Sequence, residues 1–296
     1  MARQYEDHGD PAWADRVRAN NWSRSIDLGG YDLHYLDAGS GPAVIMIHGF
    51  GDSVYSWRWN IDAFTAEGFR VAAVDLPGMG QSGRPQDFAF TQSAMAGAVV
   101  GLMHGLDINR AVIVGNSLGG NVALYMAVHY PALVDRLVLV DPACYLLGPR
   151  QRLITSAARN PHVVRLVRPF VGPWIIRAAY WQAFYDSSLI RPEMVDESSQ
   201  FLSRPDGRDN LIKTAGFYFG QEYKVLSRHY GEIHARTLLI WGEYDRVIPT
   251  RTNAEKLHNA IPGSELIIMS KVGHAPQQEQ PEKFNRIVLK YLQTEK

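Results

Sequence analysis

The sequence has a single cysteine, no net charge and no long uninterrupted apolar run. With only Cys144, the chain cannot form an internal disulfide, which is typical of proteins in a reducing compartment. Thirty basic residues balance thirty acidic ones, so charge does not indicate a nucleic-acid partner. No apolar run is long enough to cross a bilayer, and the charged N-terminus lacks the apolar segment of a secretory signal. We therefore expect a cytoplasmic protein that binds no nucleic acid and does not associate with membranes.

Short β-branched and aliphatic runs alternate with helical patterns along much of the chain. Runs that are apolar throughout are typical of strands buried on both faces of a sheet. Strand alternating with helix predicts parallel pairing, and hence a doubly wound, mostly parallel α/β sheet. An antiparallel hairpin around Gly29 and Gly30 precedes it. We expect strands at 43–48, 70–75, 110–115, 136–141, 236–242 and 265–270, and helices at about 56–67, 91–106, 118–130, from 250 and from 281.

The alternation of strand and helix is interrupted between Asp141 and Arg236. Residues 144–232 show no strand pattern and are rich in arginine, aromatic residues and proline. We interpret them as a helical cap inserted into a core domain of residues 25–143 and 233–296. Residues 1–24 are predicted to be an N-terminal extension, in which Asp10 caps a short helix that begins at Pro11.

Ser117 lies at a sharp junction between a predicted strand and a predicted helix. It is the centre of Gly115-Asn116-Ser117-Leu118-Gly119, a G-x-S-x-G pattern. A turn that raises its central side chain above the strand end brings strand and helix close together, and only very small neighbours allow this approach. In the strand–turn–helix context, the pattern predicts that Ser117 is a catalytic nucleophile.

Two later loops carry the other polar groups that a serine nucleophile needs, a base and an acid that orients it. Asp245 follows the strand 236–242, and His274 follows the strand 265–270. Loops at the carboxyl ends of parallel strands meet at one edge of the sheet, and the chain order Ser, Asp, His is that of a known triad arrangement. We prefer Asp245 to Glu243, because Pro249 is expected to open the next helix. Asp141, at the end of an earlier strand, stays open as the acid.

Backbone amides predict where an oxyanion would be held. One donor is the N–H of Leu118, directly after the nucleophile, and the second is the N–H of Phe50 in the loop His48-Gly49-Phe50-Gly51. The ten histidines show no metal-ligand spacing, and no carboxylate cluster indicates a divalent ion. We therefore expect neither a metal nor a cofactor.

These motifs together resemble the α/β-hydrolase fold family of serine hydrolases with a helical cap. The resemblance rests on HGFGDS, DLPGMGQS, GNSLGG, WGEYDRVIP and VGHAPQQEQPEKF, with Met79 standing where many relatives have histidine. Relatives that hydrolyse epoxides or haloalkanes use an aspartate nucleophile, whereas this chain has Ser117. Relatives that cleave carbon–carbon bonds usually have tryptophan after the catalytic histidine, whereas this chain has Ala275.

The resemblance implies a carboxylic ester hydrolase that acts on small to medium hydrophobic substrates through an acyl-enzyme. Three alternatives stay open. They are a cofactor-free carbon–carbon bond hydrolase of ring-fission products, a perhydrolase or lactonase, and a ligand receptor whose triad turns over slowly. The sequence does not indicate the oligomeric state.

Apolar residues of the cap are candidates for the substrate pocket, with the cap's arginines facing water. The hypothesis covers Val167, Phe170, Trp174, Ile175, Trp181 and Phe184. Helical spacing of aromatic residues is equally consistent with packing between cap helices. A basic, apolar helix can also dock on a lipid surface.

Overall fold

The computed structural model describes residues 10–85, 87–145, 149–218 and 225–294. Its centre is an eight-stranded sheet with the order β1-β2-β4-β3-β5-β6-β7-β8. β2 pairs antiparallel with β1 and β4, and all other pairs are parallel, which confirms the doubly wound, mostly parallel α/β class. The strands are β1 (Ser23–Asp27), β2 (Asp32–Ala38), β3 (Ala43–Ile47), β4 (Arg70–Val74), β5 (Ala111–Asn116), β6 (Val134–Val140), β7 (Arg236–Gly242) and β8 (Glu265–Met269).

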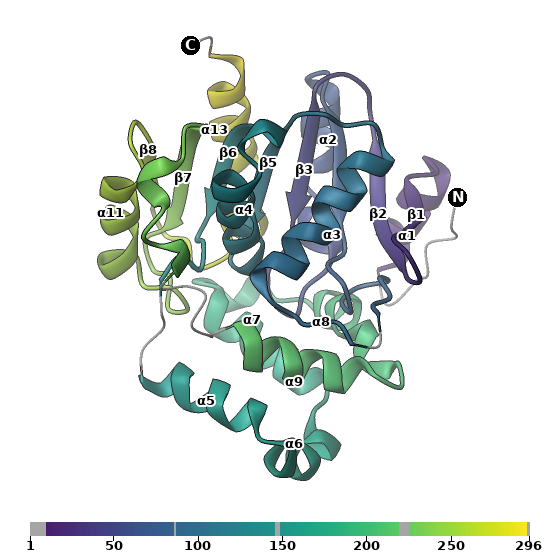
Figure 1. Ribbon diagram of the computed structural model, residues 1–296. Helices are drawn as coiled ribbons and strands as arrows, with labels where there is room; N and C mark the ends of the chain where they lie inside the picture. Colours follow the sequence, from purple (N-terminus) through teal and green to yellow (C-terminus); the bar gives the residue numbers. More distant parts are fainter. Residues whose placement is uncertain (1–9, 86, 146–148, 219–224, 295–296) are drawn as a thin grey trace.

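Helices cover both faces of the sheet (Figure 1). Alternate residues of β3 face two separate cores: Ile45 and Ile47 pack on one face, and Val44 and Met46 pack on the other. The first core includes α3 (Gln92–Gly105), α4 (Leu118–His129) and α11 (Thr250–Ala260); the second includes α1 (Pro11–Ala19), α2 (Ile61–Ala66) and α13 (Pro281–Gln293). Short turns of helix complete the core: η1 (Val54–Trp57), η2 (Pro131–Leu133), η6 (Tyr230–Glu232) and α12 (Pro276–Glu279).

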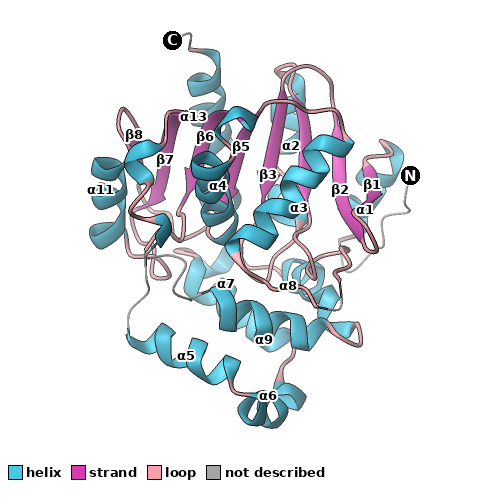
Figure 2. Ribbon diagram, in the orientation of Figure 1, coloured by secondary structure: helices cyan, strands magenta, loops and turns pink. Residues whose placement is uncertain are grey.

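A layer of helices lies below the sheet in Figure 1, beside the carboxyl ends of the parallel strands. Figure 2 shows only helices and loops in the described part of this insertion. Proline occupies the first turn of α6, α7 and α8, where its missing N–H costs no helical hydrogen bond. The elements are α5 (Pro149–Arg159), α6 (Pro161–Val167), η3 (Arg168–Phe170), α7 (Pro173–Ala183), η4 (Ser187–Leu189), α8 (Pro192–Ser199), η5 (Gln200–Ser203) and α9 (Gly207–Tyr218).

The core domain includes residues from the predicted N-terminal extension and from the end of the predicted cap. Trp13 is buried in the second core, so α1 of the predicted extension 1–24 packs as part of the core domain. Asp10 caps α1 as expected, because its Oδ1 accepts from Trp13 N at 3.0 Å. Leu226 and Tyr230, within the predicted cap range 144–232, are buried in the first core. The chain therefore returns to the core before residue 232.

The single helix predicted at 56–67 is divided into η1 and α2. The buried side chain of Arg58 donates to Gln278 Oε1 at 2.9 Å, and Asn60 Nδ2 donates to Asn285 Oδ1 at 2.7 Å. These contacts with a distant part of the chain separate the two helices, and local periodicity does not reveal them. In the part of the chain that the structure describes, no helix is both long and apolar enough to span a membrane.

Candidate active site

Ser117 stands between β5 and α4 with a strained backbone. Its φ is 53° and its ψ is −111°, a conformation that non-glycine residues seldom adopt and that often marks a functional position. Ser117 N donates to Val140 O at 3.0 Å, which ties the turn to the neighbouring strand β6. The tertiary structure therefore holds Ser117 at the carboxyl edge of the sheet, as the sequence predicts.

The glycines around Ser117 allow the strand and the helix to touch. A Cβ added to Gly115 would lie 2.3 Å from Gly119 O, and one added to Gly119 would lie 2.1 Å from Ile47 O. Such distances are far below van der Waals contact, and both clashes would be with backbone. These glycines are required by the close approach of β3, β5 and α4, as expected from the G-x-S-x-G pattern.

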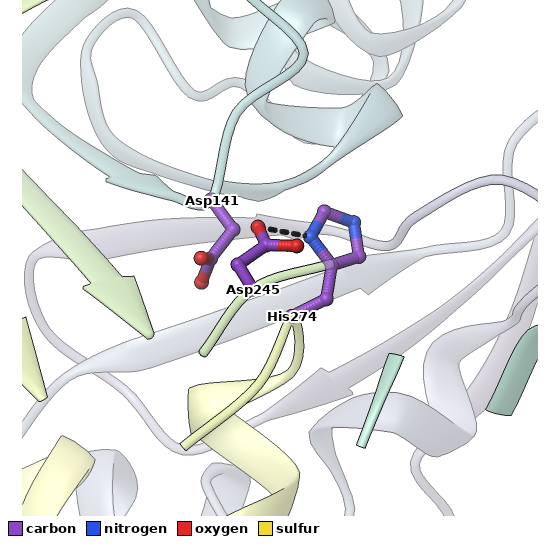
Figure 3. Close-up of side chains that lie close together, drawn as sticks. All are labelled: Asp141, Asp245 and His274. Atoms are coloured by element: carbon purple, nitrogen blue, oxygen red, sulfur yellow. Dashed lines mark hydrogen bonds and ion pairs between the residues drawn. The ribbon is translucent and has the colours of Figure 1, made fainter. Parts of the chain in front are cut away.

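His274 and Asp245 form a buried pair (Figure 3). His274 Nδ1 and Asp245 Oδ2 are 2.7 Å apart. The other oxygen, Asp245 Oδ1, accepts from Val247 N at 2.7 Å and Ile248 N at 2.9 Å. The buried His274 Nε2 has no hydrogen-bond partner among the described residues, and His274 lines the same cavity as Ser117. His274 Nε2 is therefore available to accept a proton, as the nitrogen of a general base must be.

Asp141 is a second carboxyl next to Asp245 (Figure 3). Side-chain atoms of Asp141, Asp245 and His274 lie within 4.8 Å of one another, and all three residues are buried. Asp141 Oδ1 accepts from Gly242 N at 2.9 Å. Burial and the neighbouring Asp245 carboxylate raise the pKa of Asp141 well above its usual range. Of the two carboxyls, Asp141 has the raised pKa, while Asp245 accepts two backbone N–H groups and contacts the histidine.

The free energy of unfolding should depend on pH because the pKa of Asp141 is raised in the folded chain. The folded chain keeps a proton on Asp141 that the unfolded chain releases above about pH 4, so the wild type loses stability as pH rises from there toward the raised pKa, by up to about 1.4 kcal/mol per pH unit. In Asp141→Asn, the amide accepts from Gly242 N and donates to Asp245 without titrating. We expect urea unfolding to show the variant gaining stability relative to the wild type between pH 5 and pH 8. A difference that stays constant with pH, as in the exposed control Asp87→Asn, would contradict a buried proton.

The same three residues are the one cluster among the described residues with ligand atoms close enough for a metal ion. His274 Nδ1 lies 2.7 Å from Asp245 Oδ2. When Nδ1 carries the proton of this hydrogen bond, it has no lone pair for a cation held between the imidazole and the two carboxyls. The donor set fits a hydrogen-bonded chain of two carboxyls and an imidazole better than a metal centre.

The loop after β3 packs directly on Ser117. A Cβ added to Gly49 would lie 3.4 Å from Ser117 Cβ, and Phe50 lines the cavity with Ser117. Leu118 begins α4, where backbone N–H groups have no partner within the helix. Phe50 thus lines the cavity that contains Ser117, and Leu118 follows Ser117 directly at the start of α4; these are the two residues whose amides the sequence predicts as donors to an oxyanion.

A buried network holds this loop in place. His48 Nδ1 donates to Gly49 O at 2.7 Å, and Leu76 N donates to His48 Nε2 at 3.0 Å. Asp75 Oδ1 accepts from Val54 N at 2.7 Å, and Asp75 Oδ2 lies 2.7 Å from His34 Nδ1. Both nitrogens of His48 are engaged, so His48 is a positioning residue of the loop, not a second base.

A cavity of about 610 Å³ joins Ser117 and His274 to the cap. Its walls are mostly aliphatic and aromatic, with side chains from α6, α7 and α9. The polar exceptions include Asp52, which accepts from Ser198 Oγ at 2.8 Å and from Gln278 Nε2 at 3.3 Å. The motifs did not reveal Asp52 and Gln278 as lining residues, although both lie within four positions of a predicted site residue. No arginine or lysine lies among the described residues that line the cavity.

The cap residues predicted for substrate binding divide into two groups. Val167, Ile175 and Phe184 line the cavity. The prediction is wrong for Phe170, Trp174 and Trp181, which are 71%, 62% and 64% exposed and are not among its lining residues. A helical pattern shows which residues share a face, but only packing decides whether that face meets the cavity or water.

The contacts of Cys144 and Asn116 indicate structural roles for both residues. Cys144 is buried, and burial raises the pKa of its thiol, which makes the reactive thiolate inaccessible. Asn116 Nδ2 donates to Val140 O at 3.1 Å and to His274 O at 3.2 Å. Asn116 thus ties the nucleophile turn to the histidine loop.

Comparison with known proteins shows the family of this chain. Residues 42–281 match the family model described as the alpha/beta hydrolase fold. The chain belongs to the α/β-hydrolase fold family. This α/β-hydrolase is 30% identical to a 2-hydroxy-6-oxononadienedioate/2-hydroxy-6-oxononatrienedioate hydrolase of Burkholderia vietnamiensis, over 88% of this chain and 90% of that protein. It is 34% identical to an uncharacterised protein of Mycobacterium bovis, over 90% and 79% of the two chains.

A solved structure is similar over nearly the whole of this α/β-hydrolase. It is the meta-cleavage product hydrolase from Pseudomonas fluorescens, with a TM-score of 0.76 and 27% identity over 91% of this chain and 97% of that chain. The similar proteins of assigned activity are hydrolases of the same fold. This chain is therefore a hydrolase.

Proposed function

We propose that this hydrolase cleaves carboxylic esters of small to medium, uncharged hydrophobic substrates. The observation that carries the proposal is the cavity of about 610 Å³, which converges on Ser117 and His274 and has mostly apolar walls. This volume is that of a ligand site for a small organic molecule. Since its described lining includes the Asp52 carboxylate and no cationic side chain, an anionic substrate would be repelled there, whereas an acyl chain would be bound.

The proposed chemistry uses only side chains and amides of this chain. Ser117 Oγ attacks the ester carbonyl while its proton passes to His274 Nε2. Asp245 holds His274 Nδ1 at 2.7 Å, keeping Nε2 as the acceptor and stabilising the imidazolium. The Leu118 and Phe50 amides bind the oxyanion. His274 then protonates the departing alkoxide, and a water molecule deprotonated by His274 releases the acid from Ser117.

Carbon–carbon bond hydrolysis is the second candidate, and sequence similarity favours it. The relative from Burkholderia vietnamiensis is 30% identical and is named for nonadienedioate and nonatrienedioate substrates. A dioate carries two carboxylates, which need cationic or strongly donating partners when they leave water. The described lining of this cavity supplies no such cation, so we place ester hydrolysis first.

The test is a series of p-nitrophenyl esters from acetate to octanoate. We expect kcat/KM to rise up to about fourfold per methylene while the chain is being buried, and then to level off. Ala215 lines the cavity on α9, so Ala215→Phe should shorten the preferred acyl chain without removing acetate hydrolysis. Negligible turnover of every ester, together with cleavage of a ring-fission diketone acid, would replace this proposal with carbon–carbon hydrolysis. Negligible turnover of both substrate types would favour a receptor.

A further inference from the structure

The outer face of α7 carries an unusual exposed stripe. Trp174, Arg177 and Trp181 follow each other at intervals of three and four residues, which places them on one side of the helix. The two indoles are 62% and 64% exposed, and Phe170, just before α7, is 71% exposed. Large apolar side chains grouped on a surface in this way usually mark an interaction site.

This stripe borders the active-site cavity. Trp174, Arg177 and Trp181 form a shallow depression together with Arg246, which follows Asp245 in sequence. Ala178 and Gln182 line both this depression and the cavity that contains Ser117. Helix α7 therefore has the reaction cavity on one side and the exposed stripe on the other. We call Phe170, Trp174, Arg177, Trp181 and Arg246 the aromatic–basic surface.

The chemistry of the aromatic–basic surface suits a boundary between water and hydrocarbon. Trp174 Nε1 donates to Phe170 O at 2.8 Å, so the polar atom of this indole is satisfied locally and its ring can leave water. Arginine keeps its charged head in the polar layer while its stem covers apolar surface. Tryptophan rings are typical of the headgroup level of a membrane interface, and an arginine among them can meet anionic headgroups there.

We propose that the aromatic–basic surface docks this hydrolase on an anionic phospholipid bilayer, beside the wall that it shares with the active-site cavity. This inference goes beyond the proposed function, and it replaces the expectation from composition that the protein does not associate with membranes. Docking would be peripheral, with the indoles in the headgroup layer. Apolar substrates dissolved in the bilayer would then meet the cavity without crossing water.

Charge selects the bilayer over a second copy of the chain. The depression contains Arg177 and Arg246 and no acidic residue among the described residues that form it. The stretch of sequence that contains α7, residues 146–183, has six arginines and no aspartate or glutamate, although one of them, Arg168, is paired with Asp209. A two-fold contact would place the basic patch of one copy against the same basic patch of the other. Anionic headgroups instead complement this charge, and each arginine near the bilayer surface should strengthen binding about fivefold.

Sedimentation with vesicles tests the docking. Wild type should pellet with phosphatidylglycerol-containing vesicles at low salt, bind less as salt rises, and bind pure phosphatidylcholine weakly. The double variant Trp174→Ser/Trp181→Ser should lower the partition coefficient at least about tenfold, and Arg177→Gln about fivefold. All variants should hydrolyse a water-soluble acetate ester like the wild type, because none of the three side chains lines the cavity.

Matched controls lie away from α7. Arg286→Gln on α13 and Ile268→Ser on β8 remove an exposed cation and an exposed apolar side chain, and both variants should bind vesicles like the wild type. Absence of wild-type binding to anionic vesicles would overturn the proposal, as would equal binding by the double tryptophan variant. A dimer that the double variant dissociates, without any vesicle binding, would assign the surface to self-association instead.

Discussion

Replacing Ser117 with alanine should lower kcat for ester hydrolysis by at least about 10⁴-fold, because the substitution removes the hydroxyl that is proposed to form the acyl-enzyme. The backbone of Ser117 already has a φ of 53°, and alanine keeps the same Cβ, so the turn is not additionally strained by a larger side chain. The effect should therefore appear in catalysis and leave the fold intact. The measurement is steady-state hydrolysis of a p-nitrophenyl ester, with circular dichroism to verify folding.

A covalent probe makes this prediction sharper. A fluorophosphonate should add its mass to wild type at Ser117 and leave Ser117→Ala unlabelled. Ser93→Ala on α3 removes an exposed hydroxyl and should behave as wild type in both assays. Residual activity in Ser117→Ala close to the wild-type level would show that another group is the nucleophile, whichever bond the enzyme cleaves.

Asp245→Asn should lower kcat by about 10³- to 10⁴-fold through the wrong histidine tautomer. Asp245 Oδ1 accepts from Val247 N and Ile248 N, so an asparagine would keep its oxygen there. Its amide NH₂ would then face His274 Nδ1, which would have to accept a hydrogen bond and carry its proton on Nε2. A histidine protonated on Nε2 cannot take the proton of Ser117. The KM should change little, since Asp245 is not among the residues that line the cavity.

Asp141→Asn provides the contrast for this prediction. Asp141, whose pKa is raised, accepts from Gly242 N with one oxygen, and an asparagine can do the same while its NH₂ donates to Asp245. We expect kcat within about tenfold of wild type, the cost of one altered hydrogen bond. If Asp141→Asn loses as much activity as Asp245→Asn, the acid role belongs to Asp141 or to the pair. Comparing both variants over a pH series with the same ester distinguishes these outcomes.

Motif spacing predicted the location of those side chains that the strands of the sheet hold in place. Ser117, Asp245 and His274 each follow a strand, and parallel strands bring their carboxyl ends to one edge; the structure places all three there. The same argument applies to Asp141, but the sequence could not assign the acid role, because the choice depends on N–H groups that point at one carboxylate. Helix boundaries failed where distant contacts intervene, as at Arg58 and Asn60.

What the sequence by itself determined is the α/β class, the strand-end positions of the reactive side chains and the insertion of a helical cap, because all of these follow from local periodicity and chain order. Tertiary structure alone decided which of Asp141 and Asp245 contacts His274, and the orientation of the cap's apolar residues. Phe184 and Trp181 are three residues apart in sequence, yet Phe184 lines the cavity and Trp181 is exposed. The physical reason is that α7 ends at Ala183 and Phe184 has an extended backbone, with φ of −83° and ψ of 137°. The chain therefore leaves helical geometry between the two side chains, whereas an unbroken helix would have placed both on one face.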